Sequence, residues 1–489
     1  MAELIWRLRA APRAYRNDML WVLLVGGAAA VILGWAMTVS VQSACAFALV
    51  VTIVALYQQD ERWGLTGLLT LWLVAPLIRR LLALISGPVA NDPLSLAPFL
   101  ATAALAGLAL VQVHVPTRIR VVLLLAAGGF ALGLPIGFAH GPRSALYAFI
   151  AYTAAVAAGV LGYREAQTSR GDSTLRRVLV VGMPLIAAYA IAQRYLPMSP
   201  WDQHWLDTTH FDSIGTGRND HSVRAFGSLN SPGTLAALTA LALLGYLWHF
   251  QHRMLAFLGA TLILVALSLT YVRAAWWALI IAALAHVVVS RGQSARLVLG
   301  TMAVTLAASL ALSPVSGAAR DVVDRFESIT KLGGDRSATD RSTSFSQLAP
   351  DAAATPQGHG LGTAGESTKL TGESELRFPD NGYLSLLYQV GPLGFLLVIA
   401  ALAAILHAAW TVARARGPGQ QIAQVYFAML IFIVFLLPSG DAFYSLSGVI
   451  LWFIGGQVLA YEFNQRPKEL PAPDLPGDTA APGRAPAPV

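Results

Sequence analysis

The chain contains about fourteen apolar runs separated by polar breaks, and this pattern constrains its fold more than any other feature. An apolar run of about 20 residues can cross the roughly 30 Å hydrocarbon layer of a bilayer as an α-helix. A charged share of only 12% agrees, because a soluble chain of 489 residues needs more charge to cover its surface. We therefore expect an all-α integral membrane protein with about 14 (12–14) transmembrane helices. The expected spans are 19–41, 43–57, 64–78, 96–115, 121–138, 144–162, 177–195, 234–250, 255–270, 273–290, 297–313, 382–410, 422–438 and 446–461. The runs 43–57 and 64–78 are short for a span, so each could be tilted, partly re-entrant or wrongly split.

Arginine distribution predicts the orientation of these spans. The net charge of +7 is carried almost entirely by arginine, and arginine-rich breaks alternate with arginine-poor ones. By the positive-inside rule, both termini are then cytoplasmic, and the long loops 196–233 and 314–381 lie outside. We expect residues 1–463 to form one membrane domain and 464–489 to be a disordered, Pro/Ala-rich cytoplasmic tail. The surplus charge indicates contact with the lipid bilayer and no nucleic acid.

Candidate chemistry is concentrated in the two outer loops, which combine aromatic residues, arginines and carboxylates. This mixture suits a sugar carried on a lipid phosphate, since arginine binds phosphate oxygens in pairs and a carboxylate can accept a proton. Trp201 and Trp205 could equally be anchors at the membrane interface. The histidine spacing matches no helical metal motif, and Cys45 stands alone, so we expect no metal and no cofactor. Locally, Gly358–Gly362 is more typical of a plain turn than of a phosphate-binding loop. The loop 196–233 also holds His204, Asp207, His210, Asp212, Arg218, His221 and Arg224, and the loop 314–381 holds Arg341, Glu366, Glu373, Glu375 and Asp380.

Four stretches together resemble the O-antigen polymerase and O-antigen ligase superfamily of bacterial envelope enzymes (Wzy- and WaaL-like proteins). Residues 224–233, RAFGSLNSPG, are similar to the family's Arg-x-x-Gly-x-x-x-x-Pro element, and residues 269–277, LTYVRAAWW, to its Ser-Arg-Gly-Ala-Trp helix start. Arg341 followed by GHGLGT at 358–363 resembles the Arg…Pro…Gly-x-Gly-x-Gly stretch. PDNGYL followed by GPLG, within 379–394, resembles the His-Asn-x-Tyr-Leu…Gly-x-x-Gly signature. The likeness covers roughly residues 180–410, with Asp380 at the position where the family usually has histidine.

The resemblance implies a membrane glycosyltransferase of the type C kind in the bacterial inner membrane, with its active site facing the periplasm. Such an enzyme polymerises undecaprenyl-pyrophosphate-linked repeat units into O-antigen or exopolysaccharide, with inversion and without a metal. Asp380 is then the favoured base and His359 the second candidate, with Glu366 and Glu375 behind them. Asp380 could equally be the N-cap of the following helix, since Asp is common in that role. The residues expected to bind pyrophosphate or glycan are Arg224, Arg273, Arg341, Arg79, Arg80, Asn381 and Tyr383.

Other functions stay open from the sequence. An O-antigen ligase uses the same donor and passes the glycan to lipid A core, and we rank the polymerase slightly higher because the signature histidine is missing. A flippase or transporter is less favoured, because its charges would lie within the membrane. A structural scaffold would leave the loop arginines dispensable. The expected partners are the lipid-linked oligosaccharide, a glycan or lipid A core acceptor and, as a further candidate, a chain-length regulator.

Overall fold

The computed structural model describes residues 41–87, 93–168, 173–209, 214, 223–246, 253–291, 343, 346, 349–365, 367–368, 381–417 and 419–465. Every structural statement below concerns these residues. The expected spans 19–41 and 297–313, the candidate residues Arg341 and Asp380, and the tail from 466 lie outside them.

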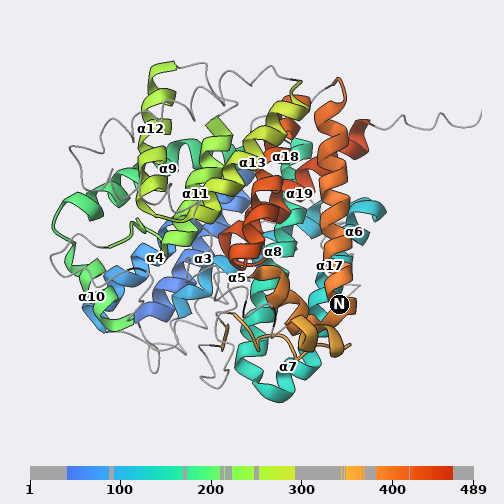
Figure 1. Cartoon of the computed structure of the whole chain (residues 1–489), viewed down its shortest axis with the longest axis horizontal. Coiled ribbons are helices and arrows are strands. Elements are labelled where there is room, and N and C mark those ends of the chain that lie inside the picture. The colour runs from blue at the N-terminus through green and yellow to red at the C-terminus, as the bar shows by residue number, and fades with distance from the viewer. Residues whose placement is uncertain are drawn as a thin grey trace, which may run out of the picture.

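The described part of the chain is built from helices and contains no strand (Figure 1). Each of the twelve predicted apolar runs that fall within it forms a helix, which confirms the all-α prediction for these residues. Eight helical stretches are long and apolar enough to cross a membrane, and α5, α11, α12 and α13 are shorter apolar helices. The chain is therefore a multi-pass membrane protein in its described part. The helices are α3 (Val41–Gln59), α4 (Glu61–Ser86), α5 (Ala97–Gln112), α6 (Thr117–Leu132), α7 (Leu134–His140), α8 (Pro142–Thr168), α9 (Thr174–Tyr195), α10 (Pro200–Thr209), α11 (Pro232–Tyr246), α12 (Arg253–Leu269), α13 (Arg273–Val289), α17 (Gly382–Arg414), α18 (Gln420–Leu436) and α19 (Ser445–Gln465), with short 3₁₀ turns at Pro93–Ser95 and Leu437–Ser439.

The expected span 64–78 is longer than the sequence indicated. Helix α4 has 26 residues and continues through Pro76, Arg79 and Arg80, whereas the apolar run ended at residue 78. The predicted end of this span at residue 78 is therefore wrong, because both arginines lie within the helix. The helix continues because Arg80 is buried against a carboxylate of another helix, so its charge does not end the span. With 19 residues in α3 as well, neither helix is too short to cross the bilayer.

Close helix packing defines the centre of the bundle. Helices α8 and α19 make the most extensive contact. A Cβ added at Gly456 of α19 would overlap the Gly159 carbonyl oxygen of α8, and one added at Gly162 of α8 would overlap the Phe453 carbonyl oxygen of α19. Small residues at such crossings let membrane helices approach without any hydrophobic driving force between them. Trp452 and Phe453 of α19 are almost completely buried beside this contact.

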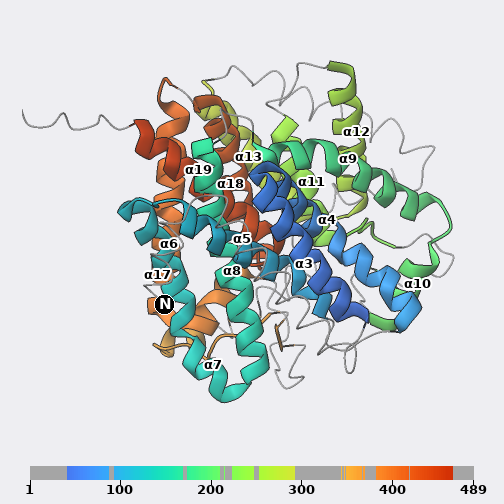
Figure 2. The same cartoon turned by 180° about the vertical axis from the view of Figure 1, so that it is seen from behind.

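Several of the segments that carry candidate residues lie at one end of the bundle, which we call the loop end. It comprises α7, α10, the segments 223–231 and 349–365, and the start of α17. Figures 1 and 2 show α7 and α10 toward the same end, lower in both views. Three aromatic rings join helices α4, α5 and α8. Trp72 of α4 packs edge-on against Phe99 of α5, and Phe99 packs edge-on against Tyr147 of α8.

Candidate functional site

Two of the motif-bearing segments meet at the loop end. The Arg224 side chain donates a 2.9 Å hydrogen bond from Nε to the carbonyl oxygen of Thr270, and the Ala225 amide donates to the Leu269 carbonyl at 3.1 Å. Thr270 immediately follows α12, and after a bend at Tyr271, whose φ is 53°, Arg273 begins α13. Arg224 and Arg273 are both half-buried. The structure thus places the two arginine-bearing segments against each other, although 46 residues separate Arg224 from Thr270 in the sequence.

Arg80 has a different environment from these two arginines. Its side chain is fully buried and pairs with Asp202 of α10 at 2.5 Å, while its second terminal nitrogen donates to the Gly227 carbonyl at 2.8 Å. Because the charge is already neutralised by Asp202, the expected role of Arg80 as a headgroup-binding residue does not fit this geometry. Arg79, its half-buried neighbour on α4, stays a predicted headgroup ligand.

The two tryptophans of the first long loop pack inward. Trp205 is 9% exposed and lies against Phe226, with 5.4 Å between ring centroids. Trp201 is half-buried and donates from Nε1 to the Tyr189 hydroxyl at 2.8 Å. Both rings therefore help to hold the loop to α9 and to the segment 223–231.

The segment Gly358–Gly362 is a packing element. The amides of residues 359, 360 and 361 donate to the carbonyls of Tyr388, Gln389 and Gly133, and the Gly362 amide donates to Oε1 of Gln389. All four amides are therefore already used, so they do not form a phosphate cradle. The interpretation of this segment as a plain turn fits the structure.

The reason for glycine in this segment is close backbone contact. Helix α17 is broken at Gly391, where φ is 70° and Pro392 follows, and Gly358 lies directly against this break. Gly360 has a φ of 103°, and a Cβ there would lie 2.5 Å from the backbone nitrogen of Gly137 in α7. Such positive φ values and contacts exclude larger residues. The segment thereby locks α7, α8 and the break in α17 together.

His359 extends from this segment toward a carboxylate that the sequence analysis did not select. Its ring stacks on Tyr388 of α17 with 4.0 Å between centroids, and its Nε2 lies 3.0 Å from Oδ2 of Asp351. The imidazole is 28% exposed and the carboxylate 55% exposed. A histidine oriented by a carboxylate is a common arrangement for proton transfer, so His359 keeps its place as a candidate base.

The start of α17 is capped by Asn381. Its Oδ1 accepts hydrogen bonds from the amides of Tyr383 and Leu384, both at 3.1 Å. These are the amides that an N-cap residue satisfies, so the capping role that the sequence left open for Asp380 is performed by its neighbour. The Tyr383 hydroxyl donates to the Val434 carbonyl at 3.1 Å, which fixes this ring against α18.

Asp441 is a second carboxylate at the start of α17 that the sequence analysis missed. It lies in the connection between α18 and α19, and its Cα is in close contact with Gly382, the first residue of α17. Its carboxylate accepts from the Tyr152 hydroxyl at 2.6 Å and from the Phe443 amide at 3.0 Å, and it is partly exposed. One signal was available: Asp441 is an acidic residue in a short break between two apolar runs.

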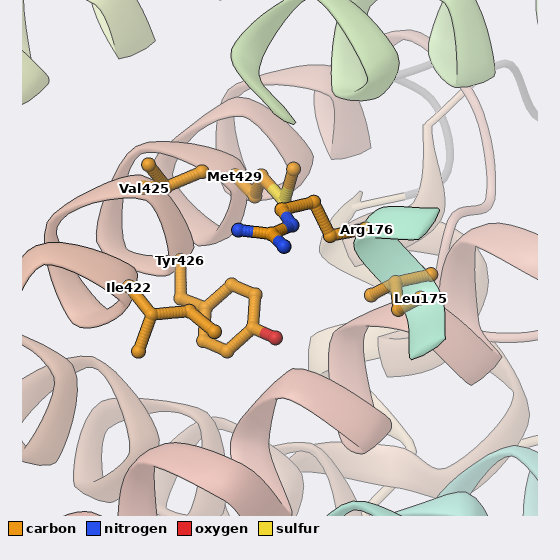
Figure 3. A pocket seen from close by; sticks show the side chains of 6 residues that line it. All are labelled: Leu175, Arg176, Ile422, Val425, Tyr426 and Met429. Carbon is orange, nitrogen blue, oxygen red and sulfur yellow. The ribbon is translucent and has the colours of Figure 1, made fainter. Parts of the chain in front are cut away.

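A hollow lies at the opposite end of the bundle, between α9 and α18. Figure 3 shows its lining of Leu175, Arg176, Ile422, Val425, Tyr426 and Met429. Arg176 and Gln193, which contacts the segment 223–231, are about 25 Å apart along α9 at 1.5 Å per residue. This hollow is therefore separate from the arginines and carboxylates of the loop end.

Other candidate residues of the two long loops fall outside the part of the chain that the structure describes. Arg341, Asp380, Glu366, Glu373 and Glu375 lie outside the described residues, as do His210, Asp212, Arg218 and His221. Within the described ranges, no group of three or more His, Cys, Asp or Glu side chains is arranged to hold a metal ion.

These features define a multi-pass helical membrane protein whose candidate arginines Arg224 and Arg273, together with Asp441, lie at the loop end. Residues 258–399 match the family model described as O-Antigen ligase (Wzy_C), which confirms the resemblance to the O-antigen polymerase and ligase superfamily. The matched range includes Arg273, the segment Gly358–Gly362 and the break in α17, while Arg224 precedes it. No curated protein and no solved structure shows significant similarity to the chain.

Proposed function

We propose that this protein is a glycosyltransferase of the bacterial inner membrane, working at the periplasmic face. It polymerises undecaprenyl-pyrophosphate-linked oligosaccharide repeat units into O-antigen or exopolysaccharide, with inversion and without a metal. The observation that carries this proposal is the contact between Arg224 and Thr270, which gathers the two arginine-bearing segments at the loop end. The match of residues 258–399 to an O-antigen ligase family supports the same class of reaction.

In this proposal, the arginines bind the leaving group. The bond between the anomeric carbon and the phosphate oxygen breaks, and negative charge grows on the lipid pyrophosphate. Fixed cations stabilise such charge most in the transition state, because they need no reorganisation. Arg224 and Arg273 supply planar guanidinium groups that can each bind two oxygens, and Arg341 and Arg79 are proposed to assist them.

The acceptor hydroxyl forms the new bond to the anomeric carbon and loses its proton to a base. Asp380 is our first candidate, because it immediately precedes Asn381 and the start of α17, where Asp441 supplies a second carboxylate. His359, oriented by Asp351, is the second candidate. Asn381 and Tyr383 are proposed to contact the glycan from the first turn of α17.

An O-antigen ligase is the second candidate function. The matching family is described as O-Antigen ligase, which favours this function. The donor chemistry would be unchanged, because only the acceptor differs. A ligase would transfer the finished glycan from the same lipid carrier to lipid A core.

A deletion strain complemented with variants tests both proposals. Loss of a polymerase leaves single repeat units on lipid A core, whereas loss of a ligase leaves long chains on the lipid carrier. Arg224→Lys and Arg273→Lys keep the charge but lose the planar fork, so each should reduce transfer on the order of 10²-fold while the protein inserts normally.

Arg143→Lys is the matched control, since Arg143 is exposed at the start of α8 and is not part of the proposed site. An unchanged glycan profile in the deletion strain would refute both functions. Equal and mild effects of all three substitutions would refute the assignment of Arg224 and Arg273 to pyrophosphate.

A further inference from the structure

The ion pair between Arg80 and Asp202 is completely buried. Arg80 is 1% exposed and Asp202 is 0% exposed, and the carboxylate also accepts from the Tyr189 hydroxyl at 2.5 Å and from Nε2 of Gln193 at 2.7 Å. Burying such a pair contributes little net stability, because desolvation offsets the attraction. The pair is therefore better explained as a contact that fixes the geometry of a neighbouring backbone segment than as a source of stability.

The pair holds the turn at Gly227, where side chains bind both the backbone carbonyl and the backbone amide of this residue. Arg80 and Gln193 donate to the Gly227 carbonyl at 2.8 and 3.2 Å, and the Gly227 amide donates to Oε1 of Gln193 at 2.8 Å. The Arg80 guanidinium also lies over the Phe226 ring, 5.0 Å from its centroid. The following residue, Ser228, donates from its hydroxyl to the Leu73 carbonyl at 2.8 Å. Helices α4, α9 and α10 thus act together on one turn.

Arg224 lies just before this turn and is held from the other direction by the end of α12. Its amide donates to the Ile214 carbonyl at 2.9 Å, its Nε donates to Thr270, and the next amide, of Ala225, donates to Leu269. The backbone at Arg224 is thus fixed in two places. The turn at Gly227 follows it in the sequence, and the bend that leads to Arg273 is hydrogen-bonded to it. A displacement of Gly227 would therefore move the Arg224 guanidinium.

We propose that Arg80 and Asp202 are positioning residues that fix the turn at Gly227 and thereby aim Arg224 at the pyrophosphate of the lipid-linked donor. This inference rests on the proposed function, which assigns Arg224 to that group. The pair does not contact the donor. Its effect is on the rate of transfer, because a cation that stabilises a leaving group loses efficiency when it is displaced by about 1 Å.

Three substitutions of different severity test this. Arg80→Lys keeps the charge but loses the planar guanidinium, whose two terminal nitrogens bind Asp202 and the Gly227 carbonyl separately. Tyr189→Phe removes one hydrogen bond to Asp202 and keeps the ring. Asp202→Asn removes the counter-charge. In purified protein with a lipid-linked donor, Arg80→Lys and Asp202→Asn should lower kcat by about tenfold or more, with Tyr189→Phe intermediate and the donor KM within about threefold.

The matched control is the second ion pair on α4, where Arg164 lies 2.7 Å from Glu61 at the far end of the helix. Glu61→Gln should leave kcat and KM unchanged.

A double-variant comparison then separates positioning from direct contact. If Arg80 acts only through Arg224, Arg80→Lys should reduce kcat by less than about twofold in an Arg224→Lys background. Thermal unfolding in detergent confirms that each variant is folded, and Tyr189→Phe retains the test if Asp202→Asn does not fold.

A raised donor KM at unchanged kcat in Arg80→Lys would overturn the proposal in favour of direct donor contact, as would losses that multiply with Arg224→Lys. Wild-type kinetics in Arg80→Lys and Tyr189→Phe would show that the pair positions nothing. If Arg224→Lys transfers glycan at the wild-type rate, the assignment of Arg224 to pyrophosphate is refuted. If Arg224→Lys loses transfer and Arg80→Lys keeps the wild-type rate, only the positioning role of Arg80 is refuted.

Discussion

The Tyr152 hydroxyl donates a 2.6 Å hydrogen bond to the carboxylate of Asp441, joining residues 289 positions apart in the sequence. The same hydroxyl accepts from Nε2 of Gln389 at 3.3 Å, and Oε1 of Gln389 accepts from the Gly362 amide. A continuous hydrogen-bonded chain therefore runs from the glycine segment to the carboxylate beside the start of α17. These hydrogen bonds hold the Asp441 carboxylate in one orientation.

Asp441→Asn should reduce glycan transfer at least about tenfold while leaving the protein folded. Asn has nearly the shape of Asp, and its Oδ1 can still accept from the Phe443 amide, but its NH2 group would have to donate to the Tyr152 hydroxyl. The change therefore removes the charge and reverses one hydrogen bond. Transfer by purified protein and thermal unfolding in detergent measure the two effects separately. Asp60→Asn is the control: Asp60 is the N-cap of α4, where Asn serves about as well, and should have no effect on transfer. Normal transfer by Asp441→Asn would make Asp441 a structural residue only.

Most of the helices could be predicted from the sequence, because the length of an apolar run alone decides whether a helix can span the bilayer. Helix α4 was underestimated because Arg79 and Arg80 lower the local hydropathy, and only Asp202, 122 residues away, explains why Arg80 is tolerated there. Burial of this kind depends on tertiary contacts that one sequence does not contain.

The candidate site was predictable in part. Arg224 and Arg273 were selected, but their meeting depends on a hydrogen bond from a side chain to the backbone of Thr270, for which no sequence pattern exists. Asp202 and Asp441 were missed for the same reason, since each is defined by a partner distant in the sequence. Asp351 was missed although its partner His359 is close in the sequence, because no motif joins the two residues. The glycines of 358–362 were noticed, and their role as packing positions needed the opposing backbone of α7 and α17.

Asn381 caps α17, so a substitution of Asp380 leaves that cap in place and tests catalysis alone. The variant for this test is Asp380→Asn. If Asp380 is the base, the variant should lose on the order of 10²-fold in transfer rate with an unchanged unfolding temperature. Asn381→Ala should instead lower stability by about 1 kcal/mol, because two amides lose their acceptor. Thermal unfolding and initial transfer rates report both effects.

The contrary outcome is transfer at the normal rate by Asp380→Asn. His359 would then be the base to test. In that case His359→Gln should abolish most transfer, and Asp351→Asn should weaken it, because Asp351 lies 3.0 Å from the imidazole Nε2.

Gly360→Ala should prevent accumulation of folded protein. The residue has a φ of 103°, and the added Cβ would lie 2.5 Å from the Gly137 nitrogen, so backbone and not a flexible side chain would have to move. The yield of monodisperse protein in detergent and its unfolding temperature are the measurements. Gly128→Ala, in α6 with open space around the position, should be neutral or slightly stabilising. Equal yields from both variants would show that Gly358–Gly362 is not a tight packing element.

Reporter fusions on either side of α9 test the orientation on which the proposed function depends. Helix α9 has 22 residues and is therefore about 33 Å long, enough to carry the chain across the hydrocarbon layer once. By the arginine distribution, a fusion after Gly171 should be active only as a cytoplasmic reporter, and a fusion after Gly217 only as a periplasmic one. A fusion after Gly334, in the second long loop, should match the one after Gly217. Cytoplasmic activity after Gly217 would place Arg224 on the wrong side for a donor presented in the periplasm, and the proposed reaction would then be excluded at this site.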